Sequence, residues 1–156
     1  MKYKLLLSIL TLVYLASCNH QTEKPEATQK ATITATDISG CYAYFSPQDT
    51  VLFHLNVQGK TFTGELVYNY FQKDKNTGTI KGKIHGDTLL ADYTFMSEGI
   101  ESVREVLFLK QGNTLVEGYG EVTEQAGKMV FPNKRNLDFS KSKPLIKTNC
   151  EEDIKG

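Results

Sequence analysis

The chain has 156 residues, with 18 basic and 18 acidic side chains and a formal net charge of zero. That balance gives no electrostatic basis for binding nucleic acid or an anionic surface. No Gly-x-Ser-x-Gly elbow, His-Glu-x-x-His pair or phosphate-binding Gly-rich loop occurs in the sequence, so we expect no enzymatic activity. For the same reason we expect no cofactor and no metal.

Residues 1–17 have the pattern of a secretory signal peptide. Lysines precede an apolar run of 11 residues, 5–15, whereas a membrane-spanning helix needs roughly 17. The run ends in Leu15-Ala16-Ser17-Cys18, which resembles the lipobox of bacterial lipoproteins. The alternative is an ordinary signal peptide with an incidental cysteine.

The lipobox resemblance implies that the chain is cut before Cys18, which is acylated on its thiol (a palmitate-type modification) and then on its new amino group. Two or more acyl chains anchor a protein stably, at about 0.8 kcal/mol per buried methylene. The partner would then be the lipid bilayer of the cell membrane or the outer membrane, with the protein facing the periplasm or the cell exterior. The resemblance is to small exported lipoproteins of unassigned activity, so it implies attachment and not chemistry.

The chain divides into three parts: a signal peptide over 1–17, the lipidated cysteine and a tether over 18–39, and a folded domain over 40–156. The tether is rich in Gln, Thr, Glu, Lys and Ala, a composition that cannot bury a core. About 20 flexible residues have a typical reach near 25 Å, which would hold the domain away from the membrane.

If Cys18 carries lipid, Cys41 and Cys150 are left as a pair. In an oxidising compartment two such thiols usually bond, so we predict a disulfide joining the start of the folded domain to its tail. The alternative is two unpaired thiols. Because the sequence has no Cys-x-x-Cys, a redox motif is not indicated.

From residue 40 onward, runs rich in Val, Ile, Thr, Tyr and Phe alternate with Gly-containing turns, which is typical of β-hairpins. The expected two-residue turns are Gly59-Lys60, Gly86-Asp87, Glu98-Gly99 and Gly112-Asn113. The expected strands are 41–45, 50–58, 61–71, 79–85, 88–97, 100–110, 114–123 and 128–131, with 136–139 as an optional ninth. The pattern also allows a short helix in the tail from Lys141.

These turns define a register. They place Phe53 opposite Leu66, Ile80 opposite Tyr93 and Leu89 opposite Phe108. If Tyr70 pairs with Ile80 across a 72–78 loop, one apolar row collects residues of five strands. That row is Phe53, Leu66, Ile84, Leu89 and Phe108. A single coherent apolar face is typical of an antiparallel meander.

We therefore predict an all-β fold, a single antiparallel meander of about 7–9 strands closed or strongly coiled into a small barrel, because closure removes exposed strand edges. Small residues inside strands, such as Gly64 and Gly82, allow the sheet to curl. The strand cadence is similar to that of the lipocalin-like (calycin) barrels, although their Gly-x-Trp signature is absent. A β-sandwich is the alternative.

The expected register gathers polar residues at one end of the barrel, where ligands often bind. With a two-residue turn at Gly112-Asn113, Arg104 faces Glu121, Val106 faces Tyr119 and Phe108 faces Glu117. A three-residue turn would point both glutamates outward. The candidate ligand-binding residues are Tyr93, Arg104, Glu117, Tyr119 and Glu121. The alternative is a polar plug that closes the barrel and needs no ligand.

The outer face carries the charged residues, with Lys81 opposite Asp92 and Asp92 opposite Glu105. His54 falls opposite Glu65, and the same register places His85 on the other side of Glu65. The histidines of that row would lie about 10 Å apart, which is wide for one zinc ion. We therefore interpret them as solvated surface residues.

The sequence thus favours a membrane-anchored binding module, without enzymatic activity, for a small ligand or an envelope partner. The alternative is a structural or assembly lipoprotein that acts through its surface and takes no small ligand. Its candidate contacts are Tyr44, Phe45, Leu52, Val67 and Leu107.

Overall fold

The computed structural model describes residues 38–150. The predicted signal peptide, the lipobox cysteine Cys18 and the tether up to residue 37 lie outside the described residues. The described elements are β1 Gly40–Phe45, β2 Thr50–Gln58, β3 Thr61–Asn69, β4 Asn76–His85, β5 Thr88–Ser97, β6 Ile100–Gln111, β7 Thr114–Glu117, β8 Thr123–Gln125, β9 Lys128–Val130, the 3₁₀ helix η1 Lys134–Asn136 and β10 Leu145–Thr148. No helix in this part has the length and hydropathy needed to cross a bilayer.

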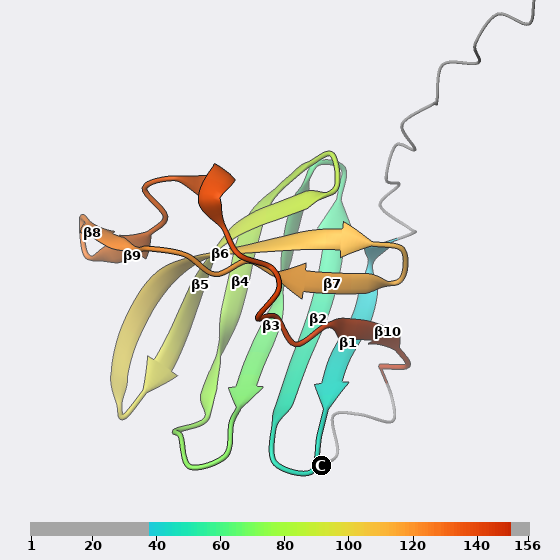
Figure 1. The fold of residues 1–156 in the computed structure, drawn as a ribbon, viewed down its shortest axis with the longest axis horizontal. Helices are drawn as coiled ribbons and strands as arrows, with labels where there is room; N and C mark the ends of the chain where they lie inside the picture. Colours follow the sequence, from blue (N-terminus) through green and yellow to red (C-terminus); the bar gives the residue numbers. More distant parts are fainter. Residues whose placement is uncertain (1–37, 151–156) are drawn as a thin grey trace, which may run out of the picture. The chain divides into compact units, whose positions relative to one another are not determined.

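Eight strands close into an antiparallel barrel (Figure 1). Their order is β5-β4-β3-β2-β1-β10-β7-β6, and the pairing of β5 with β6 completes the ring. The β8–β9 hairpin lies outside the ring, where β9 pairs in parallel with β6. The predicted all-β barrel is confirmed, and it is consistent with a small lipocalin-like barrel. A two-sheet sandwich is excluded because β5 and β6 pair along their length and leave no open edge in the ring.

All four predicted two-residue turns are present. Their flanking residues pair, as in Gln58↔Thr61, His85↔Thr88 and Gln111↔Thr114. At the Glu98-Gly99 turn both residues have positive φ, 51° and 78°, as a type I′ turn requires. These local signals fix the pairing on either side of each turn.

The registers that depend on those turns are confirmed. Phe53 pairs with Leu66, Ile80 with Tyr93 and Leu89 with Phe108. Alternate residues of these strands are buried and point into the barrel, because side chains on a strand point to opposite faces in turn.

The predicted register between β3 and β4 is wrong. Ile80 pairs with Gly64 instead of Tyr70, and Leu66 pairs with Gly78 instead of Ile84. The connection over 70–75 contains no two-residue turn signal. It is held by a 3.1 Å hydrogen bond from the Lys73 amide to the Tyr70 carbonyl oxygen and by a 2.9 Å hydrogen bond from the Phe71 amide to Asp49 Oδ1. Because the slip is an even number of residues, every side chain stays on its predicted face.

Two glycines inside strands occur where the neighbouring strand leaves no room for a side chain. A Cβ added to Gly64 would lie 2.0 Å from the His54 carbonyl oxygen, and one added to Gly82 would lie 2.2 Å from that of Leu90. These contacts are with backbone and cannot be relieved by a side-chain rotation. A residue with a side chain would therefore not fit at either position without a shift of the backbone.

The segment after β7 departs from the prediction. The expected strand over 114–123 ends at Glu117, and Tyr119 then bridges Asp138 instead of pairing with Val106. The 136–139 region holds this bridge and the end of η1, but no strand. The helix allowed from Lys141 is also wrong, because residues 145–148 form β10, which fills the gap between β1 and β7. Pro144 disfavours a helix there.

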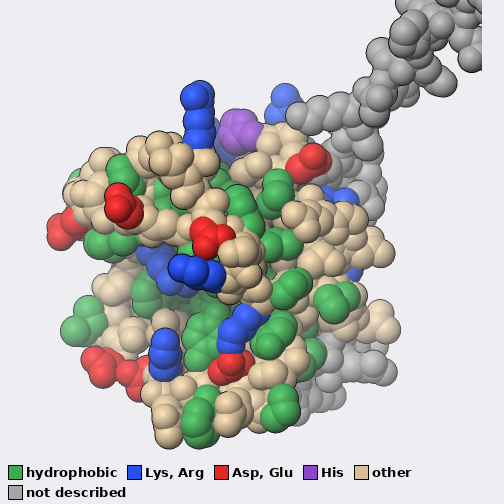
Figure 2. Space-filling model, viewed as in Figure 1, with side chains coloured by type: hydrophobic (Ala, Val, Ile, Leu, Met, Phe, Trp, Pro, Cys, Tyr) green, Lys and Arg blue, Asp and Glu red, His purple; other side chains and the backbone are tan. Residues whose placement is uncertain are grey.

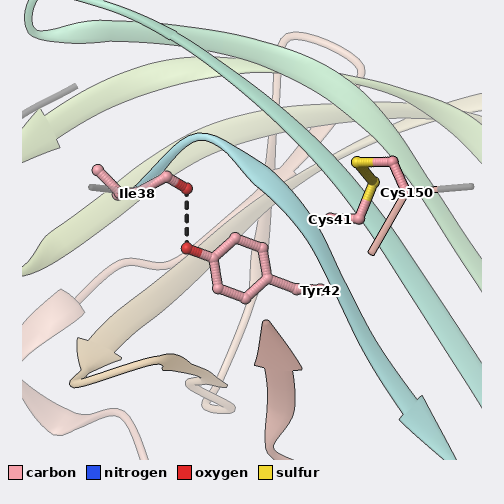
Figure 3. The surroundings of a disulfide bond; sticks show 4 residues. All are labelled: Ile38, Cys41, Tyr42 and Cys150. Carbon is pink, nitrogen blue, oxygen red and sulfur yellow. Dashed lines mark hydrogen bonds between the residues drawn. A yellow bond between two sulfur atoms is a disulfide. The ribbon is translucent and has the colours of Figure 1, made fainter. Parts of the chain in front are cut away.

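The predicted disulfide between Cys41 and Cys150 is confirmed, with a Cα–Cα distance of 5.1 Å. It ties β1 to the residues that follow β10 and so fastens the seam where the barrel closes. Figure 3 shows Tyr42 on the other side of β1, where its hydroxyl donates a 2.8 Å hydrogen bond to the Ile38 carbonyl oxygen.

The barrel interior has two different ends. The closed end is filled by Ile38, Leu55, Val57 and Phe62, all at most 8% exposed. The mouth end contains Tyr68, Tyr70, Phe95, Arg104 and Glu117. The two ends belong to the same strands, so the polar residues at the mouth are held by a packed apolar core.

Candidate functional site

The mouth end is organised around Arg104, which points inward from β6 opposite Tyr93. The centre of its guanidinium lies 5.0 Å from the ring centroid of Tyr68, 5.6 Å from that of Tyr93 and 5.7 Å from that of Phe95. Each such cation–π contact is worth roughly 0.5–2 kcal/mol, more where water is excluded. The rings therefore hold the cation in place without supplying a counter-charge.

The aromatic residues also pack on one another. Tyr93 stacks on Phe95 at 4.8 Å and meets Tyr68 edge-on at 5.7 Å. The Tyr93 hydroxyl donates a 2.9 Å hydrogen bond to the Leu66 carbonyl oxygen. The rings around Arg104 are thus a fixed part of the barrel wall.

Glu117 supplies the negative charge of the site and is the one charged residue classed as buried within 38–150. Its Oε1 lies 3.8 Å from an Arg104 terminal nitrogen, which is an ion pair but longer than a hydrogen bond. Its Oε2 accepts a 3.0 Å hydrogen bond from the Tyr119 hydroxyl, and its amide donates to Ser142 Oγ. Glu117 is therefore held from two directions and only partly neutralised by Arg104.

The environment shifts the titration of these groups. Burial raises the pKa of Glu117, while Arg104 and the hydroxyls of Tyr68 and Tyr119 oppose that shift. Burial, and then the Glu117 carboxylate, raises the pKa of Tyr70 to about 12 and also raises that of Tyr119. The tyrosines consequently keep their protons near neutral pH and remain hydrogen-bond donors.

A cleft of about 370 Å³ opens beside Arg104. It exists because β7 leaves β6 after Glu117, while β9 pairs with β6 only at Val103 and Arg104. Its lining includes Phe95, Arg104, Glu117, Val122, Met129 and Phe131. Figure 2 shows the surface indented between the β8–β9 hairpin and the β5–β6 hairpin. The cleft volume falls within the range of small-molecule sites.

Arg104, which lines the cleft, and Tyr68, whose ring lies against the Arg104 guanidinium, each have a buried polar atom that lacks a partner. Neither Arg104 Nε nor the Tyr68 hydroxyl makes a hydrogen bond within the described part of the chain. The Tyr68 hydroxyl lies close enough to Glu117 to lower the pKa of its carboxyl, but no hydrogen bond of standard geometry joins the two groups. A buried donor left without a hydrogen-bond partner destabilises the folded state by about 1–3 kcal/mol. Both groups therefore favour a site in which a ligand supplies a hydrogen-bond acceptor.

A strap over residues 138–144 passes close to the mouth. The Lys143 ammonium lies 4.6 Å from the Tyr70 ring centroid and 5.4 Å from that of Tyr44, and it pairs with Asp49. The Asp49 carboxyl has a lowered pKa because of this hydrogen bond with Lys143. The strap therefore links the 46–49 loop to the aromatic cluster and to Glu117 through Ser142.

Four of the five predicted site residues come together: Tyr93, Arg104, Glu117 and Tyr119. Glu121 does not, since it is exposed and lines a different surface cavity with Asp138 and Lys141. The predicted pairing of Arg104 with Glu121 is wrong because β7 ends at Glu117, which takes that role. Tyr68 and Phe95 were missed, although inward alternation along β3 and β5 could have found them.

A larger groove of about 660 Å³ lies on the outer face of β2–β5. It is lined mainly by outward polar residues, among them Thr63, Lys81, Asp92 and Thr94. The predicted row of Lys81, Asp92 and Glu105 is confirmed in register. Asp92 pairs with Lys128, and Glu105 pairs with Lys134 at 2.9 Å. The groove holds no buried unpartnered polar atom, so we favour the cleft beside Arg104.

The predicted outer histidine row is partly wrong. His54 pairs with Glu65, but Glu65 pairs with Thr79, so His85 is not its neighbour. The cause is the slip between β3 and β4. On its other side His54 pairs with Cys41, whose partner in the disulfide is Cys150.

The predicted surface contacts differ in exposure. Phe45 is 55% exposed, and Leu52 and Val67 are half-buried. Tyr44 is half-buried against the core. Leu107 is only 6% exposed and is not available as a contact; it was wrongly placed because sequence alternation cannot show what covers the outer wall.

Searches among protein-family models, curated proteins and solved structures each gave no match for this chain.

Proposed function

We propose that this protein is an exported, lipid-anchored binding module that holds a small amphipathic molecule in the cleft beside Arg104. The single observation that carries the proposal is that Arg104, which lines the cleft, and Tyr68, whose ring lies against its guanidinium, each have a buried polar atom without a hydrogen-bond partner in the described chain. In a closed polar plug these donors would be expected to form hydrogen bonds within the protein, because buried polar groups are normally paired.

The chemistry of the cleft defines the ligand class. Arg104 Nε can only donate a hydrogen bond, and the Tyr68 hydroxyl keeps its proton, so the ligand needs an oxygen that accepts hydrogen bonds. Val122 and Met129, 49% and 39% exposed, lie farther out along the lining and suit an apolar body. The role is binding and not catalysis.

Anchoring through Cys18 belongs to the same proposal and is supported by the lipobox resemblance of Leu15-Ala16-Ser17-Cys18. Replacing Cys18→Ser should move the protein from the membrane fraction to the soluble fraction and remove the mass of the acyl chains. Membrane association that persists in this variant, without added mass in the wild type, would contradict the anchor.

The ligand proposal is tested by native mass spectrometry of protein purified gently from its own envelope. The wild type should carry a small molecule that is absent from Arg104→Met. Arg135→Met is the matched control, because Arg135 is the other arginine of the chain and lies exposed in η1. Retention of the same molecule by all three proteins, or by none with no change of melting temperature in envelope extract, would refute the proposal.

A second candidate function is favoured by one specific observation. Phe45 and Phe71 are 55% and 53% exposed. Phe45 ends β1, and the loop that follows it accepts, through Asp49, a hydrogen bond from the Phe71 amide. Such residues suit contact with an envelope protein. Crosslinking that yields one stoichiometric partner, lost in a Phe45→Ser/Phe71→Ser variant, would support this surface role over the cleft.

A further inference from the structure

Three potential metal ligands meet on the outer wall of the barrel near its seam. Cys41 of β1 pairs with His54 of β2, and the disulfide brings Cys150 to the same place. The ligand atoms of these three residues lie within 4.8 Å of one another. Figure 3 shows the two cysteines on the side of β1 away from Tyr42 and the barrel interior.

The sulfur atoms cannot serve as strong ligands while they are bonded to each other, because metal binding uses the thiolate. A dithiol reductant changes this. Two electrons and two protons pass to the disulfide, giving two thiols, and the reductant becomes a disulfide. Each thiol then loses its proton on binding a metal ion.

We propose that reduction of the Cys41–Cys150 disulfide creates a Zn²⁺ site made of the two thiolates and the His54 imidazole. Zinc binds thiolate at about 2.3 Å and imidazole at about 2.0–2.1 Å. In a tetrahedral site, ligand atoms at those distances lie roughly 3.4–3.8 Å apart. The three groups therefore need only side-chain adjustments to surround one ion.

The surroundings suit such a site. A cavity of about 60 Å³ is lined by the two cysteines, His54 and also Glu65, which pairs with His54 across β2 and β3. Glu65 adds a carboxylate beside the imidazole, and carboxylates commonly orient a metal-binding histidine. His54 and Cys150 are exposed, so the ion and the reductant can reach them.

The barrel itself keeps the two cysteines together after reduction. β1 and β10 pair at Cys41↔Thr148, Tyr42↔Lys147 and Ala43↔Ile146, and β10 also pairs with β7. Cys150 is only two residues beyond Thr148, so the ladder limits how far its thiol can move. The site is thus gated by redox state and assembled by the fold.

The experiment titrates Zn²⁺ into the full chain in detergent, oxidised and reduced, against a chromophoric chelator. Circular dichroism follows the β-structure, and Co²⁺ in place of Zn²⁺ reports thiolate ligation through its charge-transfer absorption. The reduced wild type should bind one ion per chain and the oxidised protein none. Reduced His54→Gln should bind at least about tenfold more weakly, while reduced His85→Gln, a matched exposed histidine, should bind like the wild type.

Three results would overturn the proposal. They are equal binding by the reduced wild type and His54→Gln, equal binding by the oxidised and reduced forms, and loss of the β-sheet signal on reduction. The first would show that the cysteines bind alone, the second that the disulfide does not gate the site, and the third that the barrel does not assemble it. A smaller loss in Glu65→Gln than in His54→Gln would support the orienting role of the carboxylate.

Discussion

The closed end and the mouth end of the barrel are made by the same strands but differ in what they contain. At the closed end Ile38, Leu55 and Phe62 are at most 1% exposed and purely apolar. At the mouth, Arg104 and Glu117 meet at 3.8 Å among tyrosines. Buried polar atoms there, including Arg104 Nε and the Tyr68 hydroxyl, have no hydrogen-bond partner in the described chain. The closed end therefore contributes stability through apolar burial. The mouth instead holds buried polar groups that lack hydrogen-bond partners in the described chain.

The largest expected loss of stability comes from removing an aromatic ring at the closed end, compared with removing one at the mouth. Phe62→Ala should cost about 3–5 kcal/mol of unfolding free energy, because it leaves a cavity in a fully packed region. Phe95→Ala, at the half-buried mouth, should cost clearly less. Urea denaturation of both variants measures the difference, and equal costs would mean that the two ends are not distinct.

Removing the disulfide should cost somewhat less than the loss of Phe62. The Cys41→Ser/Cys150→Ser variant frees a loop with a sequence separation of 109 residues, and we expect a loss of about 2–5 kcal/mol. Because β10 leads back through the 138–144 strap to the mouth, hydrogen exchange should rise first over residues 138–148. An earlier rise at Phe62 and its neighbours would contradict this order.

The pH dependence of stability should be set partly by the mouth. Since the folded pKa of Glu117 is raised above 4.5, the folded state binds the proton more tightly than the unfolded state. Its contribution to stability therefore falls as pH rises from 4.5 through the folded pKa, and it recovers on acidification. Glu117→Gln should flatten this part of the profile in chemical denaturation at several pH values, while Glu121→Gln, an exposed control, should not.

The smallest effect is expected at the strap. Lys143→Ala removes a partly exposed ion pair with Asp49 and a cation–π contact with Tyr70, so we expect a loss of at most about 1 kcal/mol. Thermal melting measures the change in global stability, and the rate of proteolysis within residues 138–144 measures the change in local stability of the strap. A loss comparable to that of Phe62→Ala would show that the strap is part of the core.

The sequence predicts local pairing well and remote pairing poorly. The turns at 59–60, 86–87 and 98–99 each set the register of the strands that they join. A two-residue turn requires the residues on either side of it to pair with each other. The slip between β3 and β4 arises where six residues link the strands and no turn type is specified. Burial still follows the prediction, since an even slip preserves the inward face.

The same contrast explains the candidate site. Tyr93 and Arg104 are joined by a hairpin, and Glu117 is joined to β6 by another, so local signals bring them together. Glu121 was misplaced because the end of β7 depends on Tyr119 bridging Asp138, a remote contact. The meeting of His54 with the disulfide depends on β1 pairing with β2 and β10, which no turn signal specifies.

Closure by β10 has a consequence for how the protein is made. Strands β1 to β7 can pair in succession as translation proceeds, but β1 and β7 both keep an open edge until residues 145–148 have been synthesised. A chain stopped before Leu145 would present both edges to other molecules and would be prone to aggregate. The ring can therefore form only after nearly the whole described domain has left the ribosome.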